Sequence, residues 1–278
     1  MSTEIAVFRQ SVKNANWCAG GYVRLIIVTV LSWVLSAAPW AESLPDIIDR
    51  VRPSVVGVGT LYPDRQPNRK GSPVAYRGTG FVVGNGRQVI TNAHVIPEKL
   101  DTDNRQSLAI FAGRGASAKA HPVRLVKSDQ QHDLAVLEIL DGTTLPALDL
   151  GDSSQVREGQ EVAFTGFPIG MVLGLYPVTH RGIVAAITPV ARPMENARNL
   201  DPVQLKRLRN RYDVFQLDAI AYPGNSGSAV YDPRTGVVLG VLNSVFVKES
   251  RETMLERPSG ISYAIPVSYV KALLRASQ

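Results

Sequence analysis

Residues 80–91 read GFVVGNGRQVIT, and this stretch shows the pattern that decides the fold. Two short runs of β-forming residues, Gly80–Val83 and Val89–Thr91, are separated by glycine and asparagine, which are typical of turns. Runs of similar length recur along the chain, and helical patterns do not alternate with them. The pattern therefore favours an all-β sandwich or barrel over a fold built from βαβ units.

The β-type runs fall into two sets of six, one on each side of the turn-rich stretch from Asp141 to Gln160. The first set comprises Val55–Val58, Gly80–Val83, Val89–Thr91, Leu108–Phe111, Val123–Val126 and Leu134–Ile139. The second set comprises Val162–Gly166, Val178–Ile187, Val214–Leu217, Ala229–Tyr231, Val237–Ser244 and Ser262–Ile265. We therefore predict an all-β fold of two six-stranded antiparallel β-barrels, over about residues 50–145 and 156–266. A C-terminal helix is predicted at residues 267–276, directly after Pro266.

The composition excludes several classes of protein. Of 278 residues, 45% are apolar and 19% are charged, which excludes an intrinsically disordered chain because such chains are poor in apolar residues. A polytopic membrane protein is excluded because only one stretch is continuously apolar. The single cysteine, Cys18, cannot form an internal disulfide or a thiolate zinc site. The four histidines are scattered without a metal-ligand motif, so we expect neither a metal site nor a cofactor.

The one strongly apolar run, Leu25–Leu35, is preceded by three basic residues and one acid, and it is followed by small residues. This arrangement is typical of a secretory signal, so we predict that residues 1–41 are a signal peptide and that residues 42–278 form the exported domain. The alternative is an uncleaved anchor over residues 25–41, which would hold the protein at the inner membrane. A spanning helix needs about 20 apolar residues, a length that this run reaches only if Ala37–Ala41 is included. The length of the run therefore favours the signal peptide.

The segment from Ala191 to Tyr212 interrupts the β pattern with six basic residues against two acidic ones. Asp201 followed by Pro202 is a plausible helix start, so we interpret the segment as a basic helical excursion from the second barrel. A solvated surface helix is the favoured interpretation, and a contact with a partner or an anionic surface is the alternative. Six basic residues do not make a nucleic-acid motif, and we expect no nucleic-acid partner.

Three short stretches carry residue types that are suited to acyl transfer. They are VITNAHVI at 89–96, HDLAVL at 132–137 and PGNSGSAV at 223–230. A serine hydroxyl is a weak nucleophile until a neighbouring imidazole takes its proton, and the imidazole needs a carboxylate that holds its tautomer. We therefore predict Ser226 as the nucleophile, His94 as the general base and acid, and Asp133 as the residue that orients His94. The order His, Asp, Ser along the chain is one of the known triad orders.

Glycines lie close to Ser226 on both sides. They let the backbone adopt a tight turn in which the N–H groups of Gly224 and Ser226 point to one place. We predict that these two groups form an oxyanion hole.

With its motifs TNAHV, DLAVL and GNSG, the chain resembles the chymotrypsin-fold, trypsin-like serine peptidases, and among them the bacterial HtrA/Deg type. The similarity continues through GTGFVV at 78–83, LGDSSQVREGQEVAFTGFPIG at 150–170, VTHRGIVAAI at 178–187 and SYAIPVSYV at 262–270. The resemblance implies an exported serine endopeptidase of the bacterial periplasm. It would cleave unfolded or exposed polypeptide segments through an acyl-enzyme, without a cofactor. Deg peptidases usually continue into PDZ domains, and we expect none here because the chain ends at Gln278.

Two residues around the serine depart from the family patterns. Ser228 stands where the Deg type usually has glycine, although the glutamyl-endopeptidase type also has serine there. Asn225 precedes the serine, and an amide cannot pair with a newly cut N-terminus as the carboxylate of trypsin-like zymogens does. Activation by that route is therefore not expected.

The segments expected to form the specificity pocket are apolar or neutral. Neither Ile220–Pro223 nor Val241–Val245 contains an acidic or a basic residue. We therefore expect a small or medium apolar P1 residue in the substrate. The candidate substrate-binding residues are Ala221, Asn243 and Ser244, with the substrate added as a strand beside Asn243.

We expect the remaining three histidines and one further aspartate to have structural roles, not catalytic ones. We expect His121, which precedes Pro122, to face solvent, and His180 to be a packed or surface-facing strand residue. His132 lies beside Asp133, but the family pattern places the aspartate in the triad. Asp129 is a competing carboxylate that lacks the apolar strand following Asp133.

Two other functions stay open from the sequence. One is a peptide-binding or chaperone-like module that keeps the fold without turnover, and the other is an esterase-like hydrolase with the same triad. Polypeptide substrates are the expected partners. The sequence leaves open a homo-oligomer and a transient membrane contact through the N-terminal segment.

Overall fold

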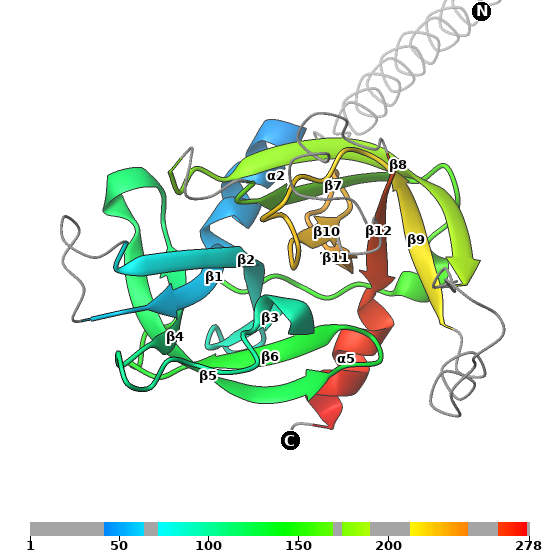
Figure 1. Cartoon of the computed structure of the whole chain (residues 1–278). Helices are drawn as coiled ribbons and strands as arrows, with labels where there is room; N and C mark the ends of the chain where they lie inside the picture. The colour runs from blue at the N-terminus through cyan, green and yellow to red at the C-terminus, as the bar shows by residue number, and fades with distance from the viewer. Residues whose placement is uncertain (1–41, 64–71, 169–173, 190–211, 244–260, 277–278) are drawn as a thin grey trace, which may run out of the picture. The chain divides into compact units, whose positions relative to one another are not determined.

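Six strands from the first half of the chain pair antiparallel and close into a barrel, drawn from blue to green in Figure 1. They are β1 (Val55–Leu61), β2 (Val74–Val83), β3 (Gln88–Thr91), β4 (Ser107–Ala112), β5 (Lys119–Asp129) and β6 (Leu134–Ile139). Their order around the barrel is β1–β2–β3–β6–β5–β4, and β4 pairs with β1 to complete the ring. The computed structural model describes residues 42–63, 72–168, 174–189, 212–243 and 261–276.

Six further strands form the second barrel. They are β7 (Glu161–Gly166), β8 (Val178–Pro189), β9 (Asp213–Asp218), β10 (Ala229–Tyr231), β11 (Val238–Asn243) and β12 (Ile261–Pro266). This barrel closes in the order β10–β11–β12–β9–β8–β7, and helix α5 (Val267–Arg275), red in Figure 1, follows β12. The predicted all-β fold of two six-stranded antiparallel barrels with a C-terminal helix is confirmed.

Short 3₁₀ helices lie in several connections. They are η1 (Arg52–Ser54), η2 (Ala93–Val95), η3 (Gly115–Ser117) and η4 (Ser153–Gln155). Of these, η2 follows β3 and carries His94, the predicted general base.

Apolar residues from several strands fill the interior of the first barrel. One buried cluster includes Val56, Val58, Val82, Ile110 and Leu137. Gly59 of β1 has no side chain where an added Cβ would lie 2.2 Å from the carbonyl oxygen of Ala75. The register between β1 and β2 shifts at this point, so the glycine permits an irregularity in the strand pairing.

A larger buried cluster joins the two barrels to both helices. Its members include Ile47 and Val51 of α2 (Leu44–Val51), Val270 and Leu273 of α5, Phe81 of β2 and Tyr231 of β10. Tyr231 is completely buried, and its hydroxyl lies 2.9 Å from Thr165 Oγ1, so its polar end is satisfied inside the core. Burial of this shared apolar surface holds the barrels and the helices together.

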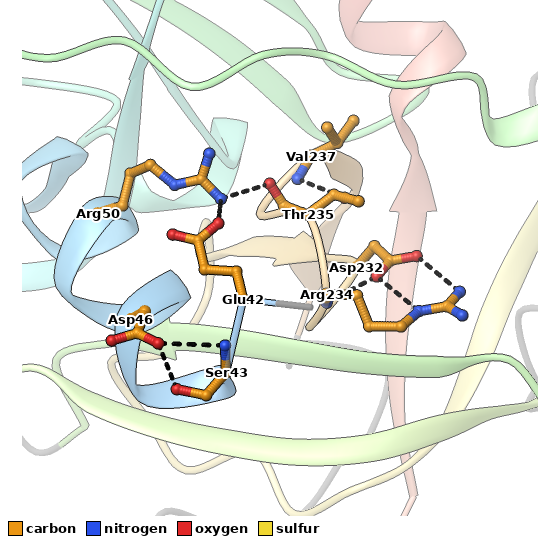
Figure 2. Close-up of polar contacts among 8 residues, drawn as sticks. All are labelled: Glu42, Ser43, Asp46, Arg50, Asp232, Arg234, Thr235 and Val237. Atoms are coloured by element: carbon orange, nitrogen blue, oxygen red, sulfur yellow. Dashed lines mark hydrogen bonds and ion pairs between the residues drawn. The ribbon is translucent and has the colours of Figure 1, made fainter. Parts of the chain in front are cut away.

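Helix α2 has no counterpart among the predicted elements. Ser43 caps its start, and the Ser43 N–H donates a hydrogen bond to Asp46 Oδ2 at 3.2 Å (Figure 2). In the last turn, Arg50 donates to Glu42 at 2.8 Å and to the carbonyl oxygen of Thr235, between β10 and β11, at 2.9 Å (Figure 2). A helix of eight residues is too short for a 3.6-residue period to be recognised, although its capping residues are present in the sequence.

Some predictions fall on residues that the structure does not describe. They concern the signal peptide or anchor at residues 1–41 and nearly all of the basic segment at 191–212. Among the residues that are described, none of the helices has the length and apolar character needed to span a bilayer. The predicted domain boundaries likewise stay predictions.

Replacing Ile47 by alanine tests how much α2 contributes to the core. Ile47 is completely buried, so Ile47→Ala should lower the free energy of unfolding by about 2–5 kcal/mol through lost burial and the cavity left behind. Ile48→Ala removes the same atoms from a half-buried position and should lower it clearly less. Urea denaturation of both variants measures the difference, and equal losses would contradict the packing of Ile47.

Candidate active site

Asp133 ends the turn between β5 and β6 in a left-handed backbone conformation. Its φ is 52°, a region that aspartate enters more readily than most residues. Asp129 shapes this turn, because its Oδ1 accepts hydrogen bonds from the N–H groups of Gln131 at 3.0 Å and His132 at 3.1 Å. The next residue, Leu134, is completely buried at the start of β6. Asp133 therefore lies at the mouth of a buried strand, as the sequence pattern indicates.

The segment that carries His94 is hydrogen-bonded to Asp133 through both backbone and side chains. His94 Nδ1 lies 2.6 Å from Asp133 Oδ2, and the His94 N–H donates to Asp133 Oδ1 at 2.9 Å. The Ala93 N–H and the Asn92 side-chain amide donate to the Asp133 carbonyl oxygen at 3.1 and 3.0 Å. The structure thus brings His94 and Asp133 together, with 31% and 16% of their side chains exposed.

Asn243, from the end of β11, reaches the same carboxylate from the second barrel. Its Nδ2 donates to Asp133 Oδ2 at 2.7 Å, so this oxygen is shared by the amide and the His94 ring. The sequence suggested Asn243 only as a substrate-binding residue, and that role stays a prediction. No local pattern in the sequence indicates the contact with Asp133, because the two residues lie 110 positions apart.

Ser226 sits in a tight turn between Tyr222 and β10 and is only 4% exposed. Gly227 follows it with φ at 89°, and an added Cβ there would lie 2.1 Å from the Thr79 carbonyl oxygen. The Gly227 N–H donates to the Leu242 carbonyl at 2.9 Å, which ties the turn to β11. Gly227 is therefore required both by its conformation and by the approach of β2.

The turns of His94 and Ser226 converge on Gly78 of β2. An added Cβ on Gly78 would lie 2.7 Å from Val95 Cγ2 and 2.9 Å from the Ser226 carbonyl oxygen. That carbonyl also accepts a hydrogen bond from the Thr79 N–H at 2.8 Å. Because Gly78 has no side chain, both Val95 and the Ser226 carbonyl can pack closely against its backbone.

The turn before Ser226 is Tyr222-Pro223-Gly224-Asn225. It is closed by a hydrogen bond from the Asn225 N–H to the Tyr222 carbonyl at 3.0 Å, and Gly224 has φ at 100°. Proline at the second position and a positive φ at the third define a type II turn. The orientation of the Pro223–Gly224 peptide, and hence of the Gly224 N–H, is set by this turn type.

The candidate pocket residues are described only in part. Ala221 is half-buried and packs against the apolar cluster inside the second barrel, whereas Ser244 lies outside the described residues. Tyr222 lies near His180 of β8, with ring centroids 6.1 Å apart. His180 in turn stacks on Phe164 at 4.9 Å, so of the two predicted alternatives, packed or surface-facing, its ring takes the packed one.

The prediction that His121 faces solvent is wrong. His121 is 8% exposed, and its Nδ1 lies 2.8 Å from Asp141 Oδ2. This hydrogen bond lowers the pKa of Asp141. The partner lies beyond the end of β6, so the local sequence around His121 does not indicate it.

His132 pairs with Asp129. Its Nδ1 lies 2.6 Å from Asp129 Oδ2, and its ring stacks on Tyr269 of α5 at 4.1 Å. Asp129 and His132 therefore form a third Asp–His pair, which supports the turn before Asp133. Within the described part of the chain, no three His, Cys, Asp or Glu side chains are grouped as they would be around a metal ion.

A family model and curated relatives point to the same family of proteins. The model of the family described as the trypsin-like peptidase domain matches residues 78–241. A probable periplasmic serine endoprotease DegP-like protein of Pseudomonas fluorescens is 28% identical, over 87% of this chain and 51% of the relative. Serine protease HTRA1A of Danio rerio is 29% identical, over 84% of this chain and 41% of the relative. This chain thus spans about half the length of these curated relatives.

Solved structures show the same fold. The HtrA-type protease AlgW with a tripeptide superposes with a TM-score of 0.58 and 24% identity, over 84% of this chain and 63% of the other. The same protease with a decapeptide gives a TM-score of 0.59 and 23% identity, over 85% and 67%. At this identity the likeness is one of fold.

The variant Gly227→Ala tests whether the turn at Ser226 needs glycine. Alanine would have to adopt φ near 89° with its Cβ 2.1 Å from Thr79 O, so the turn must move. We expect a loss of about 3 kcal/mol or more in the free energy of unfolding, together with loss of Ser226 reactivity.

Gly142→Ala is the matched control for this variant. Gly142 has φ at 81° but no atom within 4 Å of an added Cβ, so alanine there should cost only about 1–2 kcal/mol. Urea denaturation and labelling by a fluorophosphonate compare the two variants. If they behave alike in both measurements, the contact between Gly227 and β2 does not restrict the turn.

The variant His180→Phe tests whether the half-buried imidazole of His180 makes stability depend on pH. Burial lowers the pKa of His180, so below the unfolded value of about 6.5 the unfolded chain binds more protons than the folded protein. This part of the stability is complete above about pH 6.5 and is lost as the pH falls towards the native pKa. Phenylalanine keeps a ring against Phe164 without a titratable nitrogen.

We therefore expect the free energy of unfolding to decrease less in His180→Phe than in the wild type between about pH 7.5 and about pH 5.5. Urea denaturation at several pH values measures this decrease. An equal decrease in both proteins would mean that the protonation of His180 is not linked to folding.

Proposed function

Because this chain belongs to the family of trypsin-like peptidase domains, we propose that it is a serine endopeptidase with His94, Asp133 and Ser226 as its catalytic triad. Asn243 donates a hydrogen bond to Asp133 and so supports the proposed pair of His94 and Asp133. The names of the relatives, which are serine proteases, support this activity.

The observation that carries the proposal is the hydrogen-bonded chain from Asn243 through Asp133 to His94. An ionised carboxylate only accepts hydrogen bonds, so the proton between Asp133 Oδ2 and His94 lies on Nδ1 at a separation of 2.6 Å. In the neutral imidazole, Nε2 then carries the free electron pair and is the base. The second contact, from the His94 N–H to Asp133 Oδ1, fixes the carboxylate relative to the ring.

In the proposed acylation step, His94 Nε2 removes the proton of the Ser226 hydroxyl while Oγ bonds to the carbonyl carbon of the scissile peptide. The oxygen that becomes negative accepts hydrogen bonds from the N–H groups of Gly224 and Ser226. The C–N bond then breaks, and His94 gives its proton to the leaving amine. Water hydrolyses the acyl-enzyme by the same route, which restores the Ser226 hydroxyl.

We propose unfolded or exposed polypeptide segments as substrates, with a small or medium apolar P1 residue. Ile220 is 37% exposed and Ala221 is half-buried, and no charged side chain occurs from 219 to 224. Solved structural neighbours are described with a tripeptide or a decapeptide. Export to the periplasm is part of the proposal, and the relatives named as periplasmic support it.

Labelling of the full chain with a fluorophosphonate tests the triad. This probe forms a covalent bond with an activated serine, so the wild type should gain one adduct by intact mass. Ser226→Ala and His94→Ala should gain none, and turnover of unfolded casein should fall by about 10⁶-fold in Ser226→Ala. Ser228→Ala is the matched control, because the Ser228 hydroxyl is buried without a hydrogen-bond partner among the described residues.

The outcomes separate the candidate functions. Labelling and casein cleavage that persist in Ser226→Ala would contradict the assignment of the nucleophile. Binding of casein without labelling or cleavage would indicate a peptide-binding module. Hydrolysis of a p-nitrophenyl ester without cleavage of casein would indicate an esterase.

A further inference from the structure

Thr79 of β2 is a completely buried residue whose backbone is held on both sides. Its N–H donates to the Ser226 carbonyl at 2.8 Å, and its carbonyl oxygen accepts from Thr91 Oγ1 at 2.7 Å. These contacts do not involve the Thr79 side chain. The Thr79 hydroxyl is therefore presented to its neighbours from a fixed backbone.

The Thr79 hydroxyl makes two hydrogen bonds to the second barrel. It accepts from the Phe167 N–H at 3.0 Å and lies 2.7 Å from the Gly224 carbonyl oxygen. A backbone N–H can only donate and a carbonyl can only accept, so the single hydroxyl proton points to Gly224. Because Thr79 is completely buried, solvent does not reach this hydroxyl to replace either bond.

The Gly224 carbonyl belongs to the peptide that separates the two proposed oxyanion donors. The Gly224–Asn225 peptide lies between the N–H of Gly224 and the N–H of Ser226 along the chain. Its N–H donates to the Tyr222 carbonyl at 3.0 Å, and its C=O accepts from Thr79 at 2.7 Å. The peptide is thus held at both ends, once within its own turn and once from the other barrel.

We propose that Thr79 is a positioning residue for the oxyanion hole, acting through its hydrogen bond to the Gly224 carbonyl. This inference rests on the proposed serine endopeptidase function. The hydroxyl sets the position of the Gly224–Asn225 peptide relative to β2, and the Thr79 N–H sets that of the Ser226 carbonyl. One residue of the first barrel therefore holds the main chain of the second barrel at a carbonyl on either side of the Ser226 N–H.

The residues around Gly166 pack tightly against the turn of Ser226, which supports this proposal. An added Cβ on Gly166 would lie 2.2 Å from Ser228 Oγ, 2.8 Å from Asn225 Oδ1 and 3.1 Å from Thr79 Oγ1. The end of β7 therefore presses directly on the serine turn and on the Thr79 hydroxyl. Preorganised donors contribute most when they do not have to reorganise during the reaction, and such packing restricts their movement.

A comparison of four residues at position 79 separates the effect of the hydroxyl from the effect of the methyl group. Thr and Ser carry the hydroxyl, whereas Val and Ala lack it; Thr and Val carry the methyl group, whereas Ser and Ala lack it. We expect Thr79→Val and Thr79→Ala to lower kcat for unfolded casein by about 10- to 100-fold, less than the loss of an oxyanion donor itself. Thr79→Ser should stay within about threefold of the wild type, and KM should change by less than about threefold in all variants.

Three further measurements exclude a merely structural effect. The second-order rate of fluorophosphonate labelling should fall in parallel with kcat. The pH at half-maximal rate should stay unchanged, because the His94–Asp133 pair is not altered. Thr60→Val, the matched control, removes a buried hydroxyl that accepts a hydrogen bond from Gln106 in the first barrel, and it should keep the wild-type kcat.

Each outcome bears on the proposal. A wild-type rate in folded Thr79→Val would overturn it, as would a Ser variant as slow as the Ala variant. If Thr79→Val does not fold, the comparison of Ser with Ala gives the same answer. A wild type that is neither labelled nor active overturns the proposed function and this inference together. An active wild type whose rate is matched by all three variants at position 79 overturns this inference alone.

Discussion

The carboxylate of Asp133 is the point on which the candidate site depends. Its two oxygens accept hydrogen bonds from the His94 backbone, the His94 ring and the Asn243 amide, which come from both barrels. A largely buried carboxylate requires such donors, since an unpaired buried charge is costly. The left-handed backbone at Asp133 is retained because the turn, the carboxylate and the carbonyl are each held by hydrogen bonds. The orientation of His94 follows from this arrangement.

The two closed barrels provide the rigidity that the site needs. Closure leaves no open sheet edge, and the catalytic candidates lie on turns at strand ends rather than within strands. The turns of His94 and Ser226 meet at Gly78 and Thr79 of β2, through the Val95 side chain on one side and the Ser226 main chain on the other. Glycine at 78 and 227 permits this approach, so the distance between the two halves of the site is set by the main chain of β2.

Much of the fold could be predicted from short β-type runs and their turn residues. The two sets of six strands follow from composition and spacing, because strands of this length and punctuation have few other arrangements. Helix α2 was missed because its eight residues give too little periodicity. The position of His121 was predicted wrongly because the face of a strand residue depends on its register, and on a partner, Asp141, 20 residues away.

The sequence by itself determined the strand elements, the helix after Pro266, and the order of a histidine, an aspartate and a glycine-flanked serine along the chain. Only the tertiary structure decided that Asn243 bonds to Asp133 and that the Thr79 hydroxyl bonds to Gly224. These partners lie 110 and 145 residues apart, on different barrels. Local propensity and periodicity act over a few residues, whereas such contacts depend on how two complete barrels pack against each other.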